Sequence, residues 1–420
     1  MRPEVTAKLK HPDYYEPLLK RFLDYVRVPT QSDETVQETP TTQSQLKFLS
    51  DMKTELGNLG ATDVFQDDFG IVYGCLKETV PEAPSIGFCA HIDTVDIGLS
   101  PNVFPQVRRW EGRDIVLNER TGFLIKAEDH PELAPYVGMD VVFSDGSSVL
   151  GADDKAGAAS IMTMLEVIQG EKIPHGDIYV AFFPDEEIGL RGGYHVDLNR
   201  YKPVFSYTVD GSALGEIEYE TFNAANAEIR IEGVSVHPGS AKGVLVNPVL
   251  IAGELMSMFD AKDTPENSEG HEGYFWFGDI SGTPSACTVS LNIRDFDKAA
   301  FERRKDYVKN AVAFLQKRHP RAKIILTLND SYANIADFLK NDTPVRLMQR
   351  ALSNLGIPVL MHPVRGGTDG SAMSARGLAT PNIFTGGLNP HAPFECIPVV
   401  SLQKSMETLC ELVRLLNLKP

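Results

Sequence analysis

Histidine and carboxylate side chains recur in five short clusters, and each cluster follows a stretch that is expected to end a strand. The clusters are His91-Ile92-Asp93, Gly151-Ala152-Asp153-Asp154-Lys155, Asp185-Glu186-Glu187, Asp210-Gly211, and the late pair His391 and Glu395. In α/β sheets, ligands bind beyond the carboxyl ends of the strands. We therefore expect these side chains to gather at one edge of a sheet and to form a site.

The residue types indicate a metal centre. Two divalent cations about 4 Å apart need one bridging carboxylate and a few terminal histidine or carboxylate ligands. Imidazole and carboxylate without thiolate suit zinc that keeps an open position for catalysis. Of two adjacent glutamates, Glu186 and Glu187, one can hold metal while the other carries a proton. A carboxylate beside a ligating histidine fixes its tautomer, and Asp93 suits that role toward His91.

Composition excludes several other classes of function. Acidic residues outnumber basic ones by 57 to 40, a formal charge of −17, which argues against nucleic acid as a partner. Residues 1–19 have no apolar core typical of a secretory signal, and no apolar stretch is long enough to cross a bilayer. The five cysteines are scattered and lack C-x-x-C spacing. We therefore expect a cytoplasmic protein without a membrane partner, in which these cysteines are reduced and buried.

Strands alternate with helices in the first part of the chain, which favours an α/β fold with a mostly parallel central sheet. The apolar runs 85–91 and 177–183 predict buried strands, and 154–168 predicts a helix rich in alanine and glycine. The last helix, 402–416, has one apolar stripe and is expected to dock on this first domain. At 420 residues, the chain is long enough for two domains.

A different pattern begins near residue 221, where apolar and polar residues alternate with the period of a half-buried strand. It predicts strands at 227–232, 287–294 and 323–329 and helices at 245–259 and 297–317. Two helices over an antiparallel sheet form a small α+β domain. We therefore predict a discontinuous catalytic domain, 1–219 and 335–420, with a domain inserted at 220–334.

The motifs, taken in order, resemble the aminoacylase/carboxypeptidase-like clan of co-catalytic zinc peptidases, and within it the peptidase T family of tripeptidases. The segments that carry the resemblance are HIDTVD, LGADDKAG, FFPDEEIG, VHPGSAKGVLVNP, RDFD, RGGTDGS and FTGGLNPHAPFE, and they span nearly the whole chain. The resemblance implies a di-zinc aminopeptidase that releases the N-terminal residue of tripeptides through attack by a metal-activated water. It also implies two zinc ions per subunit, an inserted domain that serves as lid and dimerisation domain, and a homodimer.

Matching positions in the family imply a role for each site residue. One zinc would be held by His91 and Asp210, the other by Glu187 and His391, with Asp153 bridging both. Glu186 would be the general base and Asp93 would orient His91. The remaining implied residues lie in or near the inserted domain: His237, which would reach the active site of a second subunit, and the substrate-binding residues Asn247, Arg294 and Arg365. HAPFECI replaces the family's more usual HGxxEF, which leaves the role of Glu395 open.

Simpler structural interpretations remain for several of these residues. Asp153, Asp154 and Lys155 could cap a helix, which for Asp154 is the preferred interpretation, and Lys155 would then pair with a nearby carboxylate. Asp185, Glu186 and Glu187 could form a solvated acidic turn. His237, which precedes a proline, could be a loop residue, and Arg294 could point into solvent from the polar face of a strand.

Two other functions are also open. A related aminoacylase or carboxypeptidase would act on an N-acylated or longer substrate, and a requirement for a free α-amine separates it from an aminopeptidase. A non-catalytic peptide-binding protein could share the fold. The presence of Glu186 together with all five candidate ligands favours catalysis over that last alternative.

Overall fold

The computed structural model describes residues 10–417, so the first half of the segment tested for a secretory signal lies outside the described residues. The chain divides into two compact units. The first contains Met1–Tyr219, Phe338–His362 and Thr368–Pro420, and the second contains Glu220–Asp337 and Pro363–Gly367. Each unit is described by itself below.

The first unit is built on an eight-stranded sheet with the order β1-β2-β8-β3-β9-β16-β10-β15. Its strands are β1 (Thr62–Gln66), β2 (Val72–Leu76), β3 (Ile86–His91), β8 (Ile178–Phe183), β9 (Ser206–Gly211), β10 (Glu216–Glu218), β15 (Leu360–Met361) and β16 (Asn382–Phe384). The four central strands, β8, β3, β9 and β16, run parallel to one another. The prediction of an α/β fold with a mostly parallel central sheet is confirmed.

Helices cover both faces of this sheet. They are α1 (Tyr15–Val26), α2 (Gln43–Asn58), α3 (Ala152–Gly170), α4 (Arg191–His195), α7 (Thr343–Asn354), α8 (Asp369–Ala375) and α9 (Val399–Leu416). Val180 and Phe182 of β8 belong to the core that includes α1, α2, α3, α7 and α9. Ala181 and Phe183 belong to the core on the other face, which includes part of α8. Burial on both faces explains why residues 178–183 are continuously apolar.

Helix α3 lies very close to the sheet. A Cβ added to Gly157 would stand 2.0 Å from the carbonyl oxygen of Val209 in β9, a distance that no side chain tolerates. The glycine therefore allows the N-terminal turns of α3 to approach the carboxyl end of the parallel strands.

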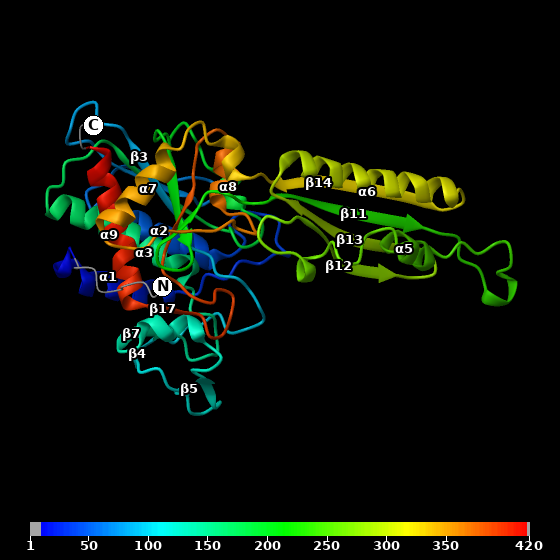
Figure 1. The fold of residues 1–420 in the computed structure, drawn as a ribbon, viewed down its shortest axis with the longest axis horizontal. Coiled ribbons are helices and arrows are strands. Elements are labelled where there is room, and N and C mark those ends of the chain that lie inside the picture. The colour runs from blue at the N-terminus through cyan, green and yellow to red at the C-terminus, as the bar shows by residue number, and fades with distance from the viewer. Residues whose placement is uncertain (1–9, 418–420) are drawn as a thin grey trace. The chain divides into compact units, whose positions relative to one another are not determined.

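A smaller sheet in the first unit was not predicted. It has the order β17-β7-β4 and lies beside the hairpin β5-β6 (Figure 1). The bounds are β4 (Gln106–Trp110), β5 (Ile115–Asn118), β6 (Phe123–Ile125), β7 (Met139–Phe143) and β17 (Cys396–Pro398). Helix α9 packs on β7 and β17, which joins this sheet to the main core. Short 3-10 helices occur at Pro12–Tyr14, Pro131–Tyr136, Pro238–Ser240, Pro265–Asn267 and Ile335–Phe338.

The second unit is an antiparallel sheet, β12-β13-β11-β14, covered by two helices (Figure 1). Its elements are β11 (Asn223–Glu232), α5 (Pro248–Met256), β12 (Tyr274–Gly282), β13 (Ala286–Asp295), α6 (Lys298–Arg318) and β14 (Lys323–Tyr332). Alternate residues such as Ile229, Ile231 and Val289 are buried in its core. Helix α5 is shorter than the predicted 245–259, because Asn247 caps it and Pro248 takes its first position.

The segment 363–367 returns to the second unit, where Val364 pairs with Thr221 in a β-bridge. The sequence alone had assigned this segment to the first domain and had placed the boundary at 334, three residues before Asp337. In the part of the chain that the structure describes, no helix is long and apolar enough to cross a membrane.

Candidate metal and catalytic centre

The candidate ligands stand at the carboxyl ends of neighbouring strands. His91 is the last residue of β3 and lies in register with Phe183, the last residue of β8. The turn after β8 therefore carries Glu186 and Glu187 past the end of β3. Asp210 lies at the end of β9, on the other side of β3.

The five predicted metal ligands contact one another in a chain. Asp153 lies between two imidazoles: its Oδ1 is 2.9 Å from Nε2 of His91, and its Oδ2 is 3.3 Å from Nε2 of His391. Nε2 of His91 is also 3.5 Å from Oδ1 of Asp210. At the other end, Nε2 of His391 is 2.9 Å from Oε1 of Glu187. Asp153 thus presents one oxygen to each half of the group, which is the arrangement that a bridging carboxylate needs.

The carboxylate of Asp93 supports this centre by contacting both His91 and the turn that carries Glu186 and Glu187. This carboxylate is fully buried, and Oδ1 lies 3.3 Å from Nδ1 of His91. Oδ1 accepts a hydrogen bond from the backbone N–H of Glu186 (2.9 Å), and Oδ2 accepts one from that of Glu187 (3.2 Å). One carboxylate therefore orients a histidine and holds the turn that carries both glutamates.

Glu395 fixes the loop that carries Asp153. Its two carboxylate oxygens accept hydrogen bonds from the backbone N–H groups of Gly151 (2.8 Å) and Asp153 (3.0 Å). A cavity of about 20 Å³ is lined by Asp153, Asp210 and Glu395, with room for about one water-sized particle. The ammonium of Lys155 donates to the carbonyl of Val28 (2.7 Å), whereas a carboxylate partner had been predicted.

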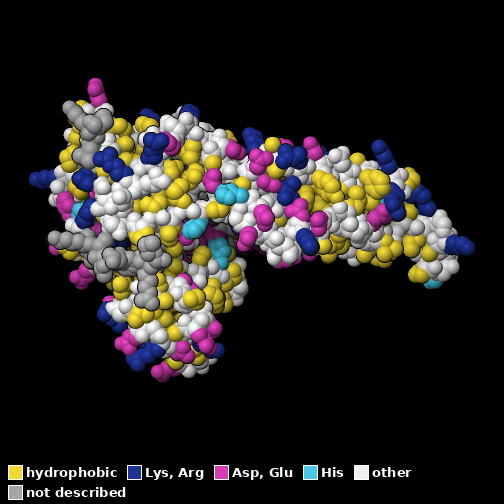
Figure 2. Space-filling view, in the orientation of Figure 1, with side chains coloured by type: hydrophobic (Ala, Val, Ile, Leu, Met, Phe, Trp, Pro, Cys, Tyr) yellow, Lys and Arg dark blue, Asp and Glu magenta, His cyan; other side chains and the backbone are white. Residues whose placement is uncertain are grey.

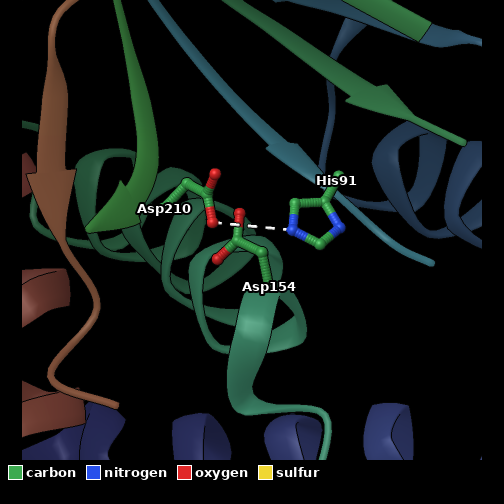
Figure 3. A group of neighbouring side chains, drawn as sticks. All are labelled: His91, Asp154 and Asp210. Carbon is green, nitrogen blue, oxygen red and sulfur yellow. Dashed lines mark ion pairs between the residues drawn. The ribbon is translucent and has the colours of Figure 1, made fainter. Parts of the chain in front are cut away.

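Asp154 is a residue whose closeness to the centre the sequence did not reveal. Figure 3 shows its carboxylate at the start of α3, pointing toward the space between His91 and Asp210. One ligand atom from each of these three residues lies within 4.8 Å of the others. Oδ1 of Asp154 accepts a hydrogen bond from the backbone N–H of Gly157 (3.1 Å), as in a helix cap, and the buried Oδ2 has no hydrogen-bond partner among the described residues.

The electrostatics of the centre fit bound cations. Burial raises the pKa of Glu186 well above its ordinary value, and that of Glu187 to about 7. Burial likewise raises the pKa of Asp210 to about 6; His91 opposes the shift and Asp153 adds to it. Contacts with Asp153 and Glu187 raise the pKa of His391 to about 10. Buried acids outnumber the two imidazoles, so divalent cations would supply the missing positive charge, and the oxygen and nitrogen donors are those that zinc accepts.

Two further acidic residues near the centre were missed as site residues. Asp369, which opens α8, is buried, and burial raises its pKa to about 8. The only sequence signal for Asp369 was its place in RGGTDGS. Glu218 ends β10, and no motif pointed to it. By contrast, Asp185 is held by Thr41 and Gln45 through three hydrogen bonds and has a structural role.

The other predicted site residues belong to the second unit. His237 is exposed, and its Nδ1 accepts a hydrogen bond from the backbone N–H of Gly239 (3.1 Å). Asn247 caps α5 by accepting from the backbone N–H of Val249 (3.0 Å). The structure therefore shows that His237 and Asn247 each stabilise the local backbone. Their catalytic and substrate-binding roles rest on the family resemblance alone.

Arg294 and Arg365 differ in how many hydrogen bonds their guanidinium groups already donate. Arg294 is half-buried on β13 and donates to the Tyr332 hydroxyl and to Oδ1 of Asn292. Arg365 donates to the carbonyls of Gly270 and Glu272, both at 3.0 Å, and to the hydroxyl of Ser268 at 2.6 Å. Arg365 thus anchors the 268–272 loop within the second unit.

Charges on the visible surface are mixed. On the face shown in Figure 2, lysine and arginine are interspersed with aspartate and glutamate, and no continuous basic patch appears among the described residues. The formal charge of the whole chain is −17.

Residues 219–323 match the family model of a peptidase dimerisation domain. Two bacterial relatives are similar over nearly their whole length. A peptidase T-like protein of Yersinia pestis is 45% identical over 399 residues, which cover 94% of this chain and 97% of the relative. Peptidase T of Bacillus subtilis is 43% identical over 403 residues, which cover 95% and 98%.

Solved structures share the fold. The aminopeptidase PepT of Bacillus cereus superposes with a TM-score of 0.76 at 23% identity, covering 96% of this chain and 98% of that one. A dinuclear metal-binding peptidase of the M20 family from Bacillus subtilis superposes with a TM-score of 0.66 at 14% identity, covering 96% and 98%. With identity above 40% over nearly full length to named relatives, the chain belongs to the peptidase T family.

Proposed function

We propose that this protein is a di-zinc aminopeptidase that releases the N-terminal residue of tripeptides. The observation that carries the proposal is the position of Asp153, which presents one oxygen to His91 and the other to His391. Family membership supports the reaction class, since relatives at this level of identity are named peptidase T.

We assign one zinc to His91 and Asp210 and the other to Glu187 and His391, with Asp153 shared. The donor set supports zinc, because it combines imidazole with carboxylate and contains no thiolate. Two such cations would polarise the scissile carbonyl and would lower the pKa of water in the site. The charge balance supports cation binding, since the buried acids otherwise have too few positive partners.

Glu186 is the general base in this proposal. Its carboxylate accepts a proton from the attacking water and delivers it to the nitrogen of the leaving dipeptide, so one water is consumed per bond cleaved. It is nine-tenths buried, and the bond from its backbone N–H to Asp93 fixes the turn that carries it. Glu187 lies next to it but points to His391, which keeps the ligand and the base distinct.

We assign substrate recognition to residues of the second unit. We assign binding of the C-terminal carboxylate to Arg294, since a guanidinium pairs with a carboxylate in bidentate fashion. Arg365 is less suited than the sequence suggested, because its guanidinium already donates to the 268–272 loop. Asn247 is assigned to the substrate backbone, using the amide N–H₂, because its side-chain oxygen caps α5.

A homodimer is part of the proposal. The match of residues 219–323 to a peptidase dimerisation domain supports it, and exposed His237 lies within that stretch. We assign His237 to the oxyanion of the reaction in a second subunit. A cytoplasmic location is supported by five free and buried cysteines.

A panel of peptides tests the function directly. Free di-, tri- and tetrapeptides, and tripeptides with a blocked amine or an amidated carboxyl, are incubated with zinc-loaded protein and with chelator-treated protein. We expect rapid cleavage of free tripeptides at the first bond, loss with chelator, and recovery when zinc is restored. Equal cleavage of N-acylated tripeptides would instead support an aminoacylase-like or carboxypeptidase-like reaction, and full activity without metal would refute the proposal.

A further inference from the structure

Glu218 lies on the same face of the main sheet as the catalytic centre. Register places Glu218 opposite Asn382 in β16, and Asn382 opposite Thr208 in β9. Thr208 lies opposite Cys89 in β3, and His91, two residues beyond Cys89 on a regularly paired strand, points to the same face. The adjacent Ile217 packs in the core on the opposite face.

The spacing places Glu218 about one substrate residue from the centre. Two strand separations and a two-residue step put its Cα about 12 Å from that of Asp210. The carboxylates of Asp210 and Asp153 are close enough to influence the pKa of Glu218, which burial first of all raises to about 8. A group bound at Glu218 would therefore lie beside a carbonyl held at the metal centre.

Of the two carboxylate oxygens of Glu218, Oε2 accepts a hydrogen bond and Oε1 accepts none from the described residues. The amide nitrogen of Asn382 donates to Oε2 at 2.9 Å, and the hydroxyl of Thr368 donates to the amide oxygen of Asn382 at 2.9 Å. The network fixes which end of the Asn382 amide faces the glutamate. Within residues 10–417, no hydrogen bond or ion pair reaches Oε1, and the side chain is only half-buried.

Because its pKa is raised to about 8, Glu218 would be held in its charged form by a bound cation, and its surroundings suit an ammonium better than a metal. Glu218 is not part of either group of side chains that could hold a metal ion in the described chain. Its near neighbours of the same charge, Glu216 and Asp210, leave the negative charge uncompensated. An ammonium needs only one carboxylate and carries three donors, whereas a metal needs several ligands in one shell.

We propose that Glu218 binds the free α-ammonium group of the substrate and thereby makes this enzyme an aminopeptidase. The inference rests on the proposed function and adds the residue that selects a free N-terminus. Asn382 is a positioning residue, since it orients the glutamate without reaching the amine. In this arrangement the scissile carbonyl would lie at the bound metals, and the amine, one Cα away, would pair with Oε1 of Glu218.

Binding measured without turnover tests the inference. Trialanine and its des-amino analogue, propionyl-alanyl-alanine, are titrated by calorimetry into the zinc-loaded Glu186→Gln protein. We expect trialanine to bind at least about tenfold more tightly, as for a charge-assisted pair. The quantity compared is the affinity for trialanine divided by the affinity for the des-amino analogue. Adding Glu218→Gln should bring this affinity ratio close to one, with unchanged zinc content. The matched control is Glu216→Gln, since its carboxylate shares the strand and face but accepts from the backbone N–H of Ala213, and it should keep the ratio.

Each other outcome overturns the inference. A preserved ratio in Glu218→Gln would show that the amine is bound elsewhere, and loss of zinc in that variant would make Glu218 part of the metal centre. A ratio near one in the parent protein would show that no amine is recognised. If Glu218→Gln does not fold, Glu218→Asp is the second variant, since it moves the carboxylate away from the substrate and keeps the charge. It should lower the affinity ratio partially. An unchanged ratio in Glu218→Asp would count against the inference.

The test also separates this inference from the proposed function. Hydrolysis of trialanine by the native protein, together with a preserved ratio in Glu218→Gln, would leave the function standing and remove the inference. Absence of tripeptide hydrolysis by the native zinc-loaded protein would remove the function, and the inference with it.

Discussion

Replacing Asp93 by asparagine should weaken zinc binding although Asp93 is not itself a ligand. In the native protein, Oδ1 and Oδ2 accept from the backbone N–H groups of Glu186 and Glu187, respectively, and Oδ1 also lies 3.3 Å from Nδ1 of His91. Asparagine has nearly the same size but only one acceptor oxygen. If that oxygen keeps the hydrogen bond from the backbone N–H of Glu186, the amide N–H₂ must face the backbone N–H of Glu187. Both groups are donors, so no hydrogen bond can form between them.

The magnitude follows from these contacts. One charge-assisted hydrogen bond is lost and a buried N–H is left unsatisfied, which should cost about 1.5–3 kcal/mol of folding stability in the metal-free protein. The imidazole of His91 also loses an anionic neighbour that makes it a better donor to metal, although its Nδ1 keeps the contact with the backbone carbonyl of residue 93 (3.1 Å), so the loss should lie at the lower end of the range that follows. Partners of this kind are worth about 10- to 100-fold in metal affinity, or about 1.4–2.7 kcal/mol.

Zinc competition with a chromophoric chelator measures the affinity, and thermal unfolding of the metal-free protein measures the stability. Asp185→Asn is the matched control, because Asp185 is equally buried and accepts three hydrogen bonds, but from Thr41 and Gln45 rather than from the site. We expect the control to lose stability and to keep its zinc affinity. Native zinc affinity in Asp93→Asn, or equal loss in both variants, would refute the reasoning.

Four further predictions concern single roles. Glu186→Gln should retain zinc and bind substrate while turnover falls about 10²–10⁴-fold, and near-native turnover would exclude Glu186 as the base. Metal analysis should find two zinc ions in the loaded native protein and loss of both in Asp153→Ala; retention of one tightly bound ion would contradict a bridging role. Arg294→Ala should flatten the preference for tripeptides over dipeptides at unchanged zinc content, and a preserved preference would place the carboxylate site elsewhere. Chains carrying His237→Ala, mixed with Glu186→Gln chains, should regain activity in heterodimers, and heterodimers that form without activity would exclude a shared site.

Local pattern was sufficient for much of the fold. The apolar runs 85–91 and 177–183 could be assigned to buried strands because burial on both faces removes alternation, whereas alternation at 227–232 and 287–294 marked a sheet with one polar face. Helix 297–317 was predicted within one residue of α6, since Asp297 caps it. The sheet of β4, β7 and β17 was not foreseen, because β17 has three residues and its partners lie more than 250 positions earlier in the chain.

The candidate centre could likewise be located from residue types. Histidine and carboxylate at strand ends indicated a metal site, because parallel strands deliver their carboxyl ends to one edge of the sheet. His91, Asp153 and His391 are far apart in sequence and in contact in the structure. Their residue types defined the ligand chemistry, and the topology brought them together.

Only the tertiary structure showed where each acid of the candidate centre points. Adjacent carboxylates such as Asp153 and Asp154 have the same chemistry. The turn at the start of α3 directs Asp153 toward His91 and His391, and Asp154 toward His91 and Asp210. Glu218 had no sequence signal, because its position depends on strand register across β16. Sequence determines which groups are available and where strands and helices begin. The direction of a side chain and its hydrogen-bond partners depend on packing between segments that are distant in the chain, and local residue patterns do not encode that packing.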